Sequence, residues 1–401
     1  MTPSMRLAPV VAVLALLASP AAGASFIFTP VAAGNGDFDP FGFGAPVLND
    51  SGLVAFNAAL SDGTQGIFRW AGGPLAAIAL ENGFRRFGDP SINAAGQVGF
   101  EASLRSIRGE GIFRGDGGPV TPIAGTRDAG DFDFVNAGPS INAAGRVAFI
   151  GERIVGGAFI DGVYAGDGGP VAPIYDATGP FADFTGNPSL NDGGVAAFLA
   201  TLDSGIGGLF LGSGGAFTTV ADETGVLTSV FGFGDPSLND RGEVAFRAGT
   251  NVGDPDDNSG ATGEGIFLFS GGVLTPVLQG SFSDFSSLGD PSLNNLGQVA
   301  FLVEPDFGNQ VLLTGPDLLA DRVIGTGDTL AGRRVSGLSF SREGLNDSGQ
   351  LAFTAFFEDG SAGVFLATPA AIPAPGSLAL LLAGLAAALG TARRAPRSGY
   401  A

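Results

Sequence analysis

The chain has 401 residues, 45% of them hydrophobic, with 68 glycines, 25 prolines and 34 phenylalanines, and its formal net charge is −20. Cysteine and histidine are absent and every basic residue is an arginine, which excludes disulfides, thiolate or imidazole metal sites, histidine-activated nucleophiles and Schiff-base lysines. The negative charge argues against nucleic acid as a partner, because phosphate binding depends on lysine and arginine.

Residues 1–24 have the features of a secretory signal peptide. Arg6 supplies the positive start, residues 7–18 form an apolar run, and Ala22-Gly23-Ala24 matches the small-x-small cleavage pattern. The alternative is an uncleaved anchor, but the run is short for a span of about 20 residues. We therefore expect cleavage before Ser25 and export of the remaining chain.

Residues 25–371 contain one motif, Asn-x-x-Gly-x-x-[Ala/Gly]-Phe, seven times, at intervals of 44 to 55 residues. Asparagine caps its own turn and tolerates the left-handed region, and glycine adopts positive φ without steric cost, so each Asn-x-x-Gly predicts a turn between two antiparallel strands. These structural turn residues are Asn49 and Gly52, Asn93 and Gly96, Asn142 and Gly145, Asn191 and Gly194, Asn239 and Gly242, Asn294 and Gly297, and Asn346 and Gly349.

Each repeat offers four strand signals. In the second repeat we expect strands at residues 90–92, 97–104, 111–114 and 120–124, separated by turn residues. Repeats of this length with four strands each are typical of propeller blades. In the fifth repeat, Val244 and Phe246 should point to one face of the blade and Ala245 to the other.

The two ends of the repeat region complement each other. The last repeat has no fourth strand, whereas residues 28–32 (FTPVA) precede the first repeat and match the fourth strands at 274–278 (LTPVL) and 120–124 (VTPIA). A ring closed by the N-terminal strand accounts for both ends and removes exposed sheet edges. The sequence therefore predicts an all-β, seven-bladed β-propeller of four-stranded antiparallel blades.

These repeats resemble the tandem-repeat NxxGxxAF family over nearly the whole of residues 25–371. The resemblance implies display at the cell surface and no particular activity.

Three sets of polar residues are candidates for chemistry. Serines recur at one place in the first strand, which indicates a scaffold role: Ser91, Ser140, Ser189, Ser237 and Ser292. Asp89, Asp235 and Asp290 precede a proline in that strand; we expect turn capping or channel solvation, with a channel-bound cation as the alternative.

The longest interval between motifs contains an acidic loop at residues 253–265. Asp254, Asp256 and Asn258 suggest a calcium loop, but Ser259 and Gly265 stand where the EF-hand pattern has Gly and Glu. A solvated loop is the main interpretation and calcium the alternative; we expect no other cofactor.

Residues 372–401 are arranged like a sorting signal. Pro373 and Pro375 are followed by an apolar stretch at residues 378–389 and by Arg393 and Arg394. The order resembles the PEP-CTERM signal, with Ala374 where that signal has Glu. The resemblance implies a short transmembrane helix held transiently in the inner membrane, cleavage by an exosortase-type protease, and a Gram-negative host that makes exopolysaccharide. A plain membrane anchor is the alternative.

The sequence thus predicts an exported, non-catalytic surface or extracellular-matrix propeller that presents loops for binding. One alternative is a carbohydrate-active enzyme with paired carboxylates from different blades about 5–10 Å apart. Another is a lectin-like module for exopolysaccharide, which would expose Trp70 or Tyr164 in a concave site. A surface protein is a further possible partner.

Overall fold

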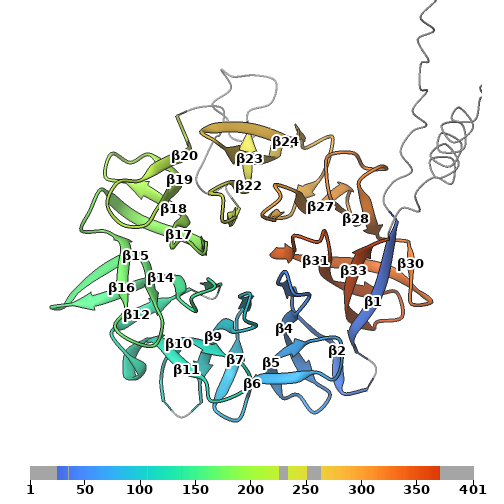
Figure 1. The fold of residues 1–401 in the computed structure, drawn as a ribbon, viewed down its shortest axis with the longest axis horizontal. Helices are drawn as coiled ribbons and strands as arrows, with labels where there is room; N and C mark the ends of the chain where they lie inside the picture. The colour runs from blue at the N-terminus through green and yellow to red at the C-terminus, as the bar shows by residue number, and fades with distance from the viewer. Residues whose placement is uncertain are drawn as a thin grey trace, which may run out of the picture.

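The computed structural model describes residues 25–370 except 35, 106, 137, 225–233 and 251–262. Seven antiparallel sheets surround a central channel, so the chain is a seven-bladed β-propeller, as the repeats predict (Figure 1). Among the described residues the only helix is the 3-10 turn η1 (Arg127–Ala129). No helix in this part of the chain is long and apolar enough to span a membrane. The expected signal peptide and C-terminal sorting segment lie outside the described residues.

The strands follow each other blade by blade. Those of blades 1 and 2 are β2 (Phe38–Phe43), β3 (Val47–Leu48), β4 (Val54–Leu60), β5 (Gln65–Trp70), β6 (Ala76–Leu80), β7 (Phe84–Phe87), β8 (Ser91–Ile92), β9 (Val98–Leu104), β10 (Glu110–Gly115) and β11 (Thr121–Gly125). Those of blades 3 and 4 are β12 (Phe132–Val135), β13 (Ser140–Ile141), β14 (Val147–Val155), β15 (Ala158–Gly166), β16 (Ala172–Asp176), β17 (Phe181–Leu190), β18 (Ala196–Leu202), β19 (Gly207–Gly212) and β20 (Thr218–Asp222).

The remaining strands complete the ring. Those of blades 5 and 6 are β21 (Ser237–Leu238), β22 (Val244–Thr250), β23 (Gly263–Ser270), β24 (Val273–Ser281), β25 (Ser287–Leu288), β26 (Ser292–Leu293), β27 (Val299–Asp306), β28 (Asn309–Leu313) and β29 (Arg322–Gly325). Those of blade 7 are β30 (Thr329–Leu330), β31 (Arg333–Leu345), β32 (Leu351–Phe357), β33 (Ala362–Pro369) and the N-terminal β1 (Phe26–Ala33).

The innermost strand of a blade is longer than the sequence predicts. In blade 2 both β7 and β8 pair with β9, and Gly88-Asp89-Pro90 interrupts them. Only the β8 half was expected. The interruption has a local cause: proline has no N–H to donate to the ladder and restricts the residue before it.

Closure by the N-terminal strand is confirmed. β1 pairs antiparallel with β33, placing Phe28 opposite Ala367, Thr29 opposite Leu366 and Ala32 opposite Val364. Figure 1 shows this blue strand beside the red end of the chain. The Ala370 N–H also donates to the Ser25 carbonyl, with an N–O distance of 2.7 Å. The seventh blade therefore takes its outer strand from the opposite end of the sequence.

The hydrophobic core is divided among the spaces between neighbouring blades. Seven clusters of buried side chains fill the seven interfaces, including the one where blade 7 meets blade 1. Val244 and Phe246 belong to the cluster between blades 4 and 5, whereas Ala245 belongs to the next one. The seven motif phenylalanines are all fully buried: Phe56, Phe100, Phe149, Phe198, Phe246, Phe301 and Phe353.

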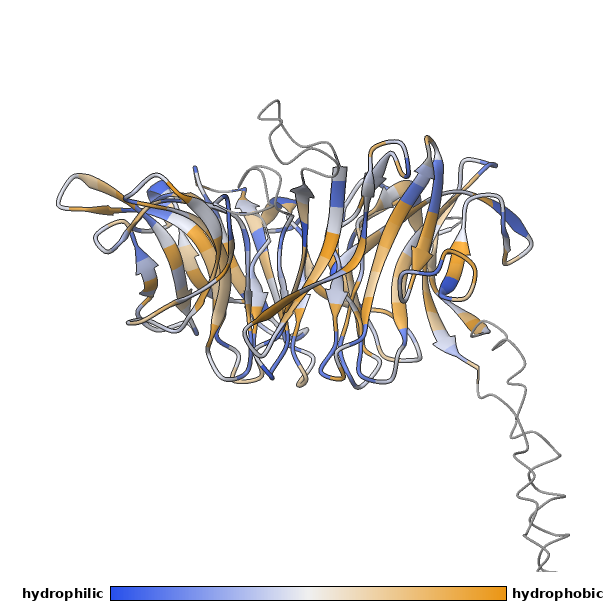
Figure 2. Ribbon diagram, turned by 90° about the horizontal axis from the view of Figure 1, so that it is seen from above, coloured by the Kyte–Doolittle hydropathy of each residue, from blue (hydrophilic) through white to orange (hydrophobic). Residues whose placement is uncertain are grey.

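Alternating strand directions give the ring two different edges, seen from the side in Figure 2. We call one edge the Asn face. It carries the turns at residues 49–52, 93–96, 142–145, 191–194, 239–242, 294–297 and 346–349, together with the loops between third and fourth strands. The opposite edge is the loop face. It carries the loops between second and third strands, at residues 61–64, 105–109, 156–157, 203–206, 307–308 and 358–361, and the connections between blades. Both Ser25 and Ala370 lie at the Asn face.

Candidate functional site: the central channel

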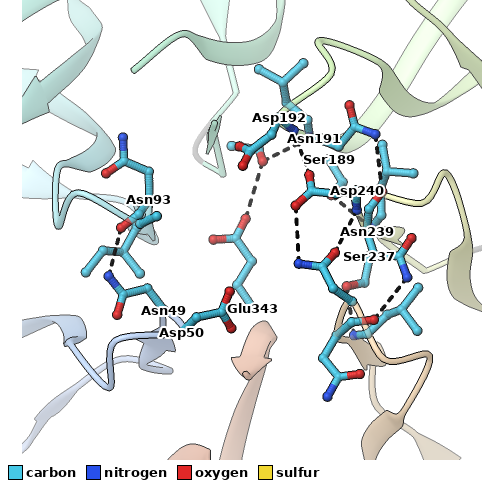
Figure 3. A pocket seen from close by; sticks show the side chains of 18 of the residues that line it. Asn49, Asp50, Asn93, Ser189, Asn191, Asp192, Ser237, Asn239, Asp240 and Glu343 are labelled. Atoms are coloured by element: carbon cyan, nitrogen blue, oxygen red, sulfur yellow. Dashed lines mark hydrogen bonds between the residues drawn. The ribbon is translucent and has the colours of Figure 1, made fainter. Parts of the chain in front are cut away.

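A closed ring of hydrogen bonds surrounds the channel at the Asn face. The side-chain amide of each motif asparagine donates to the backbone carbonyl of the motif asparagine in the next blade, at 2.9 to 3.3 Å, and Asn346 closes the ring by donating to the Asn49 carbonyl. Figure 3 shows part of this ring. Each asparagine therefore joins two blades. The sequence motif predicts only its role in the turn of its own blade.

The same asparagines also shape their own turns. Each side-chain oxygen accepts the backbone N–H four residues later, as from Leu53 to Asn49 at 2.9 Å. None of these asparagines has positive φ, so tolerance of the left-handed region is not why asparagine is present. The motif glycines do have positive φ, between 72° and 80°.

The repeated serines form a second set of links. Ser140, Ser189, Ser237 and Ser292 each accept the backbone N–H of a leucine in the next blade at 3.0 to 3.1 Å. Ser91 is buried, and its hydroxyl has no hydrogen-bond partner. The serines thus act between blades as scaffold residues.

Four aspartates and Asn295 follow the asparagines at the channel mouth. Asp192, Asp240, Asn295, Asp347 and Asp50 each accept the backbone N–H of the equivalent residue in the preceding blade, at 2.6 to 2.9 Å. Burial, followed by repulsion from Asp347, Asp240 and Asp192, raises the pKa of Asp50, and the hydrogen bond from the Asp347 N–H opposes that rise. These acids meet across blades because they hold backbone amides.

Blade 7 inserts two charged side chains into the channel. The Arg342 guanidinium donates to the carbonyls of Asn187 and Gly138, at 3.0 and 3.1 Å. Glu343 lies between the labelled asparagines and aspartates in Figure 3, and its carboxylate accepts a 3.4 Å hydrogen bond from the Ser140 hydroxyl. Burial is the main cause that raises the pKa of Glu343 to about 7, against the opposing effect of Arg342.

This insertion divides the channel into two small hollows. They have volumes of about 170 and 180 Å³, and both are lined by Arg342 and Glu343. Pockets that hold ligands of drug size have volumes of roughly 300–1,000 Å³. Each hollow of the channel is therefore smaller than a pocket for a ligand of drug size.

A signal for this insertion exists in the sequence. Blades 2, 5 and 6 have Gly-Asp-Pro-Ser before the Leu-Asn or Ile-Asn pair, whereas blade 7 has Ser341-Arg342-Glu343-Gly344. A repeat motif is defined by what its copies share, so it does not include the different residues at this place in the last copy. The role of Arg342 becomes visible only in the closed ring, because its partners Asn187 and Gly138 lie 155 and 204 positions away in the sequence.

The expected channel aspartates do lie inside the channel. Asp89, Asp235 and Asp290 line the second hollow together with Arg342. Asp235 accepts the Asn187 N–H at 2.8 Å, and Asp290 contacts Arg247 at 3.3 Å. Burial raises the pKa of Asp89, and the Arg342 guanidinium opposes that rise. Among the described residues, no three carboxylates are placed to hold a metal ion.

The other candidate residues have separate positions. Asp254, Asp256 and Asn258 lie outside the described residues, as do Pro373, Pro375, Arg393 and Arg394. Tyr164 is only 1% exposed, and Trp70 packs against the core between blades 7 and 1. Neither aromatic side chain forms the open sugar platform that a lectin-like site at these residues would require.

Comparison with solved structures shows the fold alone. A structure described as prolyl endopeptidases shares 13% identity, with 86% of this chain and 47% of that chain covered, at a TM-score of 0.52. Prolyl oligopeptidase B from Galerina marginata shares 11% identity over 80% of this chain and 49% of its own, at 0.47. A putative TolB from Agrobacterium tumefaciens shares 16% identity, with 60% of this chain and 81% of that chain covered, at a TM-score of 0.38. This chain therefore spans about half the length of the peptidases it matches.

Comparison by sequence adds a family. No curated protein matches the chain. One family model matches residues 71–302 and again residues 169–379, which together cover most of the propeller. On this match, the chain belongs to the family described as "Family of unknown function (DUF7453)".

Proposed function

We propose that this protein is an exported, non-catalytic propeller that binds a partner through its loop face. The observation that supports the proposal is the filled channel. Arg342 and Glu343 leave hollows of about 170 and 180 Å³, and the nearby carboxylates hold backbone amides. Binding then falls to the outer surface.

The loop face has the exposed apolar side chains that a binding surface needs. Phe307 is 94% exposed, Phe41 74% and Phe159 59%, and all three lie at this edge. Phe134, Ile154, Val155, Ile107 and Phe282 add further exposed apolar area there. These side chains are spread over several blades, and exposed apolar area is one mark of surfaces that meet another molecule.

The positions of the chain ends favour presentation of this face. Ser25 and Ala370 both lie at the Asn face. We propose that residues 1–24 direct export and that residues 372–401 hold the chain at the membrane until an exosortase-type protease cleaves them. A chain held by its C-terminal end would direct the Asn face toward the cell and the loop face away from it.

The binding proposal is tested by a matched pair of variants. Phe307→Ser removes the most exposed side chain of the loop face, and Leu319→Ser removes an 85% exposed side chain of the Asn face. We expect Phe307→Ser to lower the fraction of exported protein retained on host cells at least threefold and Leu319→Ser to leave it unchanged. Equal retention of both variants would contradict binding through the loop face.

Activity and processing have separate tests. We expect no hydrolysis of common polysaccharides, with or without calcium; turnover abolished by one carboxylate substitution would establish an enzyme instead. Mass spectrometry of the surface fraction, with and without the host's sorting protease, should show loss of residues 372–401 only when the protease is present. Intact Tyr400-Ala401 in the wild-type surface fraction would contradict the processing proposal.

A further inference from the structure

A groove rich in arginine lies on the loop face between blades 2 and 3. It has a volume of about 1030 Å³ and is lined by Arg85, Arg86, Arg105, Arg108 and Arg127. Residues 25–371 contain 15 arginines against 39 acids, so one third of the positive charge of this acidic body gathers at one place. These arginines come from β7, from the loop after β9 and from η1.

Two of the arginines are available to a ligand. Arg105 pairs with Glu81, and Arg86 lies 3.7 Å from Glu110 in an exposed pair that contributes little stability. Arg108 and Arg127 are exposed, and neither has an ion-pair partner among the described residues. Their guanidinium groups therefore present several unused donors to the groove.

Arg127 is held in a conformation that its own side chain disfavours. Its φ is 52°, in the left-handed region, and only Ala331 shares this among the described non-glycine residues. Such conformations are strained and are concentrated at binding sites. A glycine would relieve the strain here, so the presence of an arginine argues that its side chain has a use.

The rest of the lining is neither purely basic nor purely polar. Asp128 and Asp133 are exposed carboxylates in the groove, where they can accept hydrogen bonds from hydroxyl groups. Phe134 and Ile107, which are 49% and 40% exposed, add apolar surface. The groove thus offers donors for carboxylates, acceptors for hydroxyls and apolar contacts for C–H faces.

The groove continues toward the outside of the ring. A second hollow, of about 740 Å³, shares Leu104, Ile107 and Asp128 with the first and extends past η1 to Arg153. Two hollows that share lining residues form one extended groove along the surface. Such a shape suits a chain-like ligand better than a compact one.

We propose that this groove binds an acidic polysaccharide, with sugar carboxylates at Arg108 and Arg127 and sugar hydroxyls at Asp128 and Asp133. The proposal rests on the proposed function, because it names the ligand class for one part of the loop face. A polysaccharide with one carboxylate per sugar carries both negative and hydroxyl groups, and the lining holds both arginines and aspartates. A densely charged polyanion would bring negative charge onto the aspartates and against a net charge of −20.

The test measures binding of the full-length chain to polygalacturonate by calorimetry at 50 and 300 mM salt. Dextran serves as the neutral polymer and polyphosphate as the densely charged one. We expect polygalacturonate to bind, with affinity that falls as salt rises, and dextran not to bind. Equal binding of dextran, or no binding of polygalacturonate at 50 mM salt, would overturn the proposal, and tighter binding of polyphosphate would replace the saccharide with a dense polyanion.

Substitutions then locate the site. Arg108→Gln with Arg127→Gln should weaken polygalacturonate binding at least tenfold. Arg334→Gln is the matched control, because Arg334 is 62% exposed on the loop face of blade 7 and pairs with Glu358 at 2.9 Å; its affinity should change less than twofold. Equal losses in both variants would overturn the assignment to this groove.

Arg127→Gly separates binding from structure. It should raise the melting temperature by relieving the positive φ while weakening polygalacturonate binding at least threefold. Wild-type affinity in this variant would remove Arg127 from the site. Loss of polygalacturonate binding alone, with the retention difference between Phe307→Ser and Leu319→Ser intact, would overturn the ligand class and leave loop-face binding standing.

Discussion

The Asn face and the loop face are built from the same seven repeats, yet they differ in what their residues do. At the Asn face every motif asparagine makes the same two contacts, one within its turn and one to the next blade. Where the structure describes the loop face, the connections between second and third strands differ from blade to blade, from two residues at 156–157 to five at 105–109. The comparison teaches that the repeated contacts which close the ring lie at one edge, although the loops between third and fourth strands at that edge also vary, from two residues at 271–272 to eight at 314–321.

The physical reason lies in cooperativity around the ring. Each motif asparagine reaches the next blade, so a change in one copy removes a contact from its neighbour. A loop at the other edge contacts mainly its own blade, so it can acquire an arginine, a phenylalanine or an insertion independently. The five predictions below test this difference, from the largest expected effect to the smallest.

Removal of β1 should have the largest effect, because both faces depend on closure. Deleting residues 26–33 exposes the edge of β33 and empties part of the core between blades 7 and 1, where Val31 and Ala32 are buried. We expect a loss of more than about 5 kcal/mol, sufficient to unfold a typical domain. A synthetic peptide of residues 25–34 should restore the circular dichroism spectrum. A deletion variant that melts like the wild type would contradict closure by this strand.

Asn239→Ala breaks the Asn face at one point. It removes the 3.0 Å bond to the Asn294 carbonyl and the 3.0 Å bond from the Glu243 N–H, and it leaves both backbone groups without these partners. We expect the free energy of unfolding to fall by about 2–4 kcal/mol in urea titrations. Asp62→Ala is the loop-face control, since Asp62 accepts the Thr64 N–H at 2.8 Å within one exposed turn and reaches no other blade. Equal shifts in both variants would erase the difference between the two faces.

Glu101→Leu should stabilise the protein, because the half of a blade nearer the loop face tolerates departures from the repeat. Glu101 is 1% exposed and neither carboxylate oxygen has a hydrogen-bond partner, whereas blade 4 has Leu199 at the equivalent place. We expect a gain of about 1–3 kcal/mol at pH 8, measured by urea denaturation. Glu101→Gln should gain less. Destabilisation by the leucine would show that the Glu101 carboxylate stabilises the folded state.

Gly242→Val tests the turn of the Asn face without touching a neighbour. Gly242 has a φ of 77°, and no heavy atom lies within 4 Å of a Cβ added there, so the cost is backbone strain alone. We expect a loss of about 1 kcal/mol or more. Gly83 also has open space but lacks positive φ, so Gly83→Val should change the melting temperature less. Equal thermal shifts would count against the turn interpretation.

The pH dependence of stability should carry the smallest effect. Burial raises the pKa of both Glu343 and Glu101 to about 7, from an ordinary 4.5. A raised carboxyl pKa means that the folded state holds the proton longer than the unfolded state. The stability that these two groups contribute is fully present below about pH 4.5 and is lost as the pH rises through about 7. We expect a lower melting temperature at pH 8 than at pH 5.

Two variants assign this slope. Glu343→Gln and Glu101→Gln should each flatten the dependence between pH 5 and pH 8 by an amount on the order of 1 kcal/mol. Glu304→Gln is a suitable control, because Glu304 lies in β27 near the loop face and its carboxylate accepts from the exposed Ser287 hydroxyl at 3.0 Å. A wild-type slope that survives both channel and interface variants would mean that other carboxyls carry it.

Several features of the fold were predictable because they repeat. Val244, Ala245 and Phe246 follow strand periodicity, and the structure places them in two adjacent cores as that periodicity predicts. The split first strand was missed in blade 2 because residues 84–87 (FRRF) contain two arginines and do not look like a buried strand. The cross-blade asparagine bonds were missed because a motif read one copy at a time contains no neighbour.

The sequence by itself determined the number of blades, the turns and the closing strand, because each is encoded by local periodicity or by a spare strand at one end. Only the tertiary structure decided what the channel contains and where the arginines meet. Arg342 contacts Gly138 across 204 residues, and Arg86, Arg108 and Arg127 approach one groove from three separate elements. Side chains that come from distant segments acquire a common function only when the ring brings those segments together.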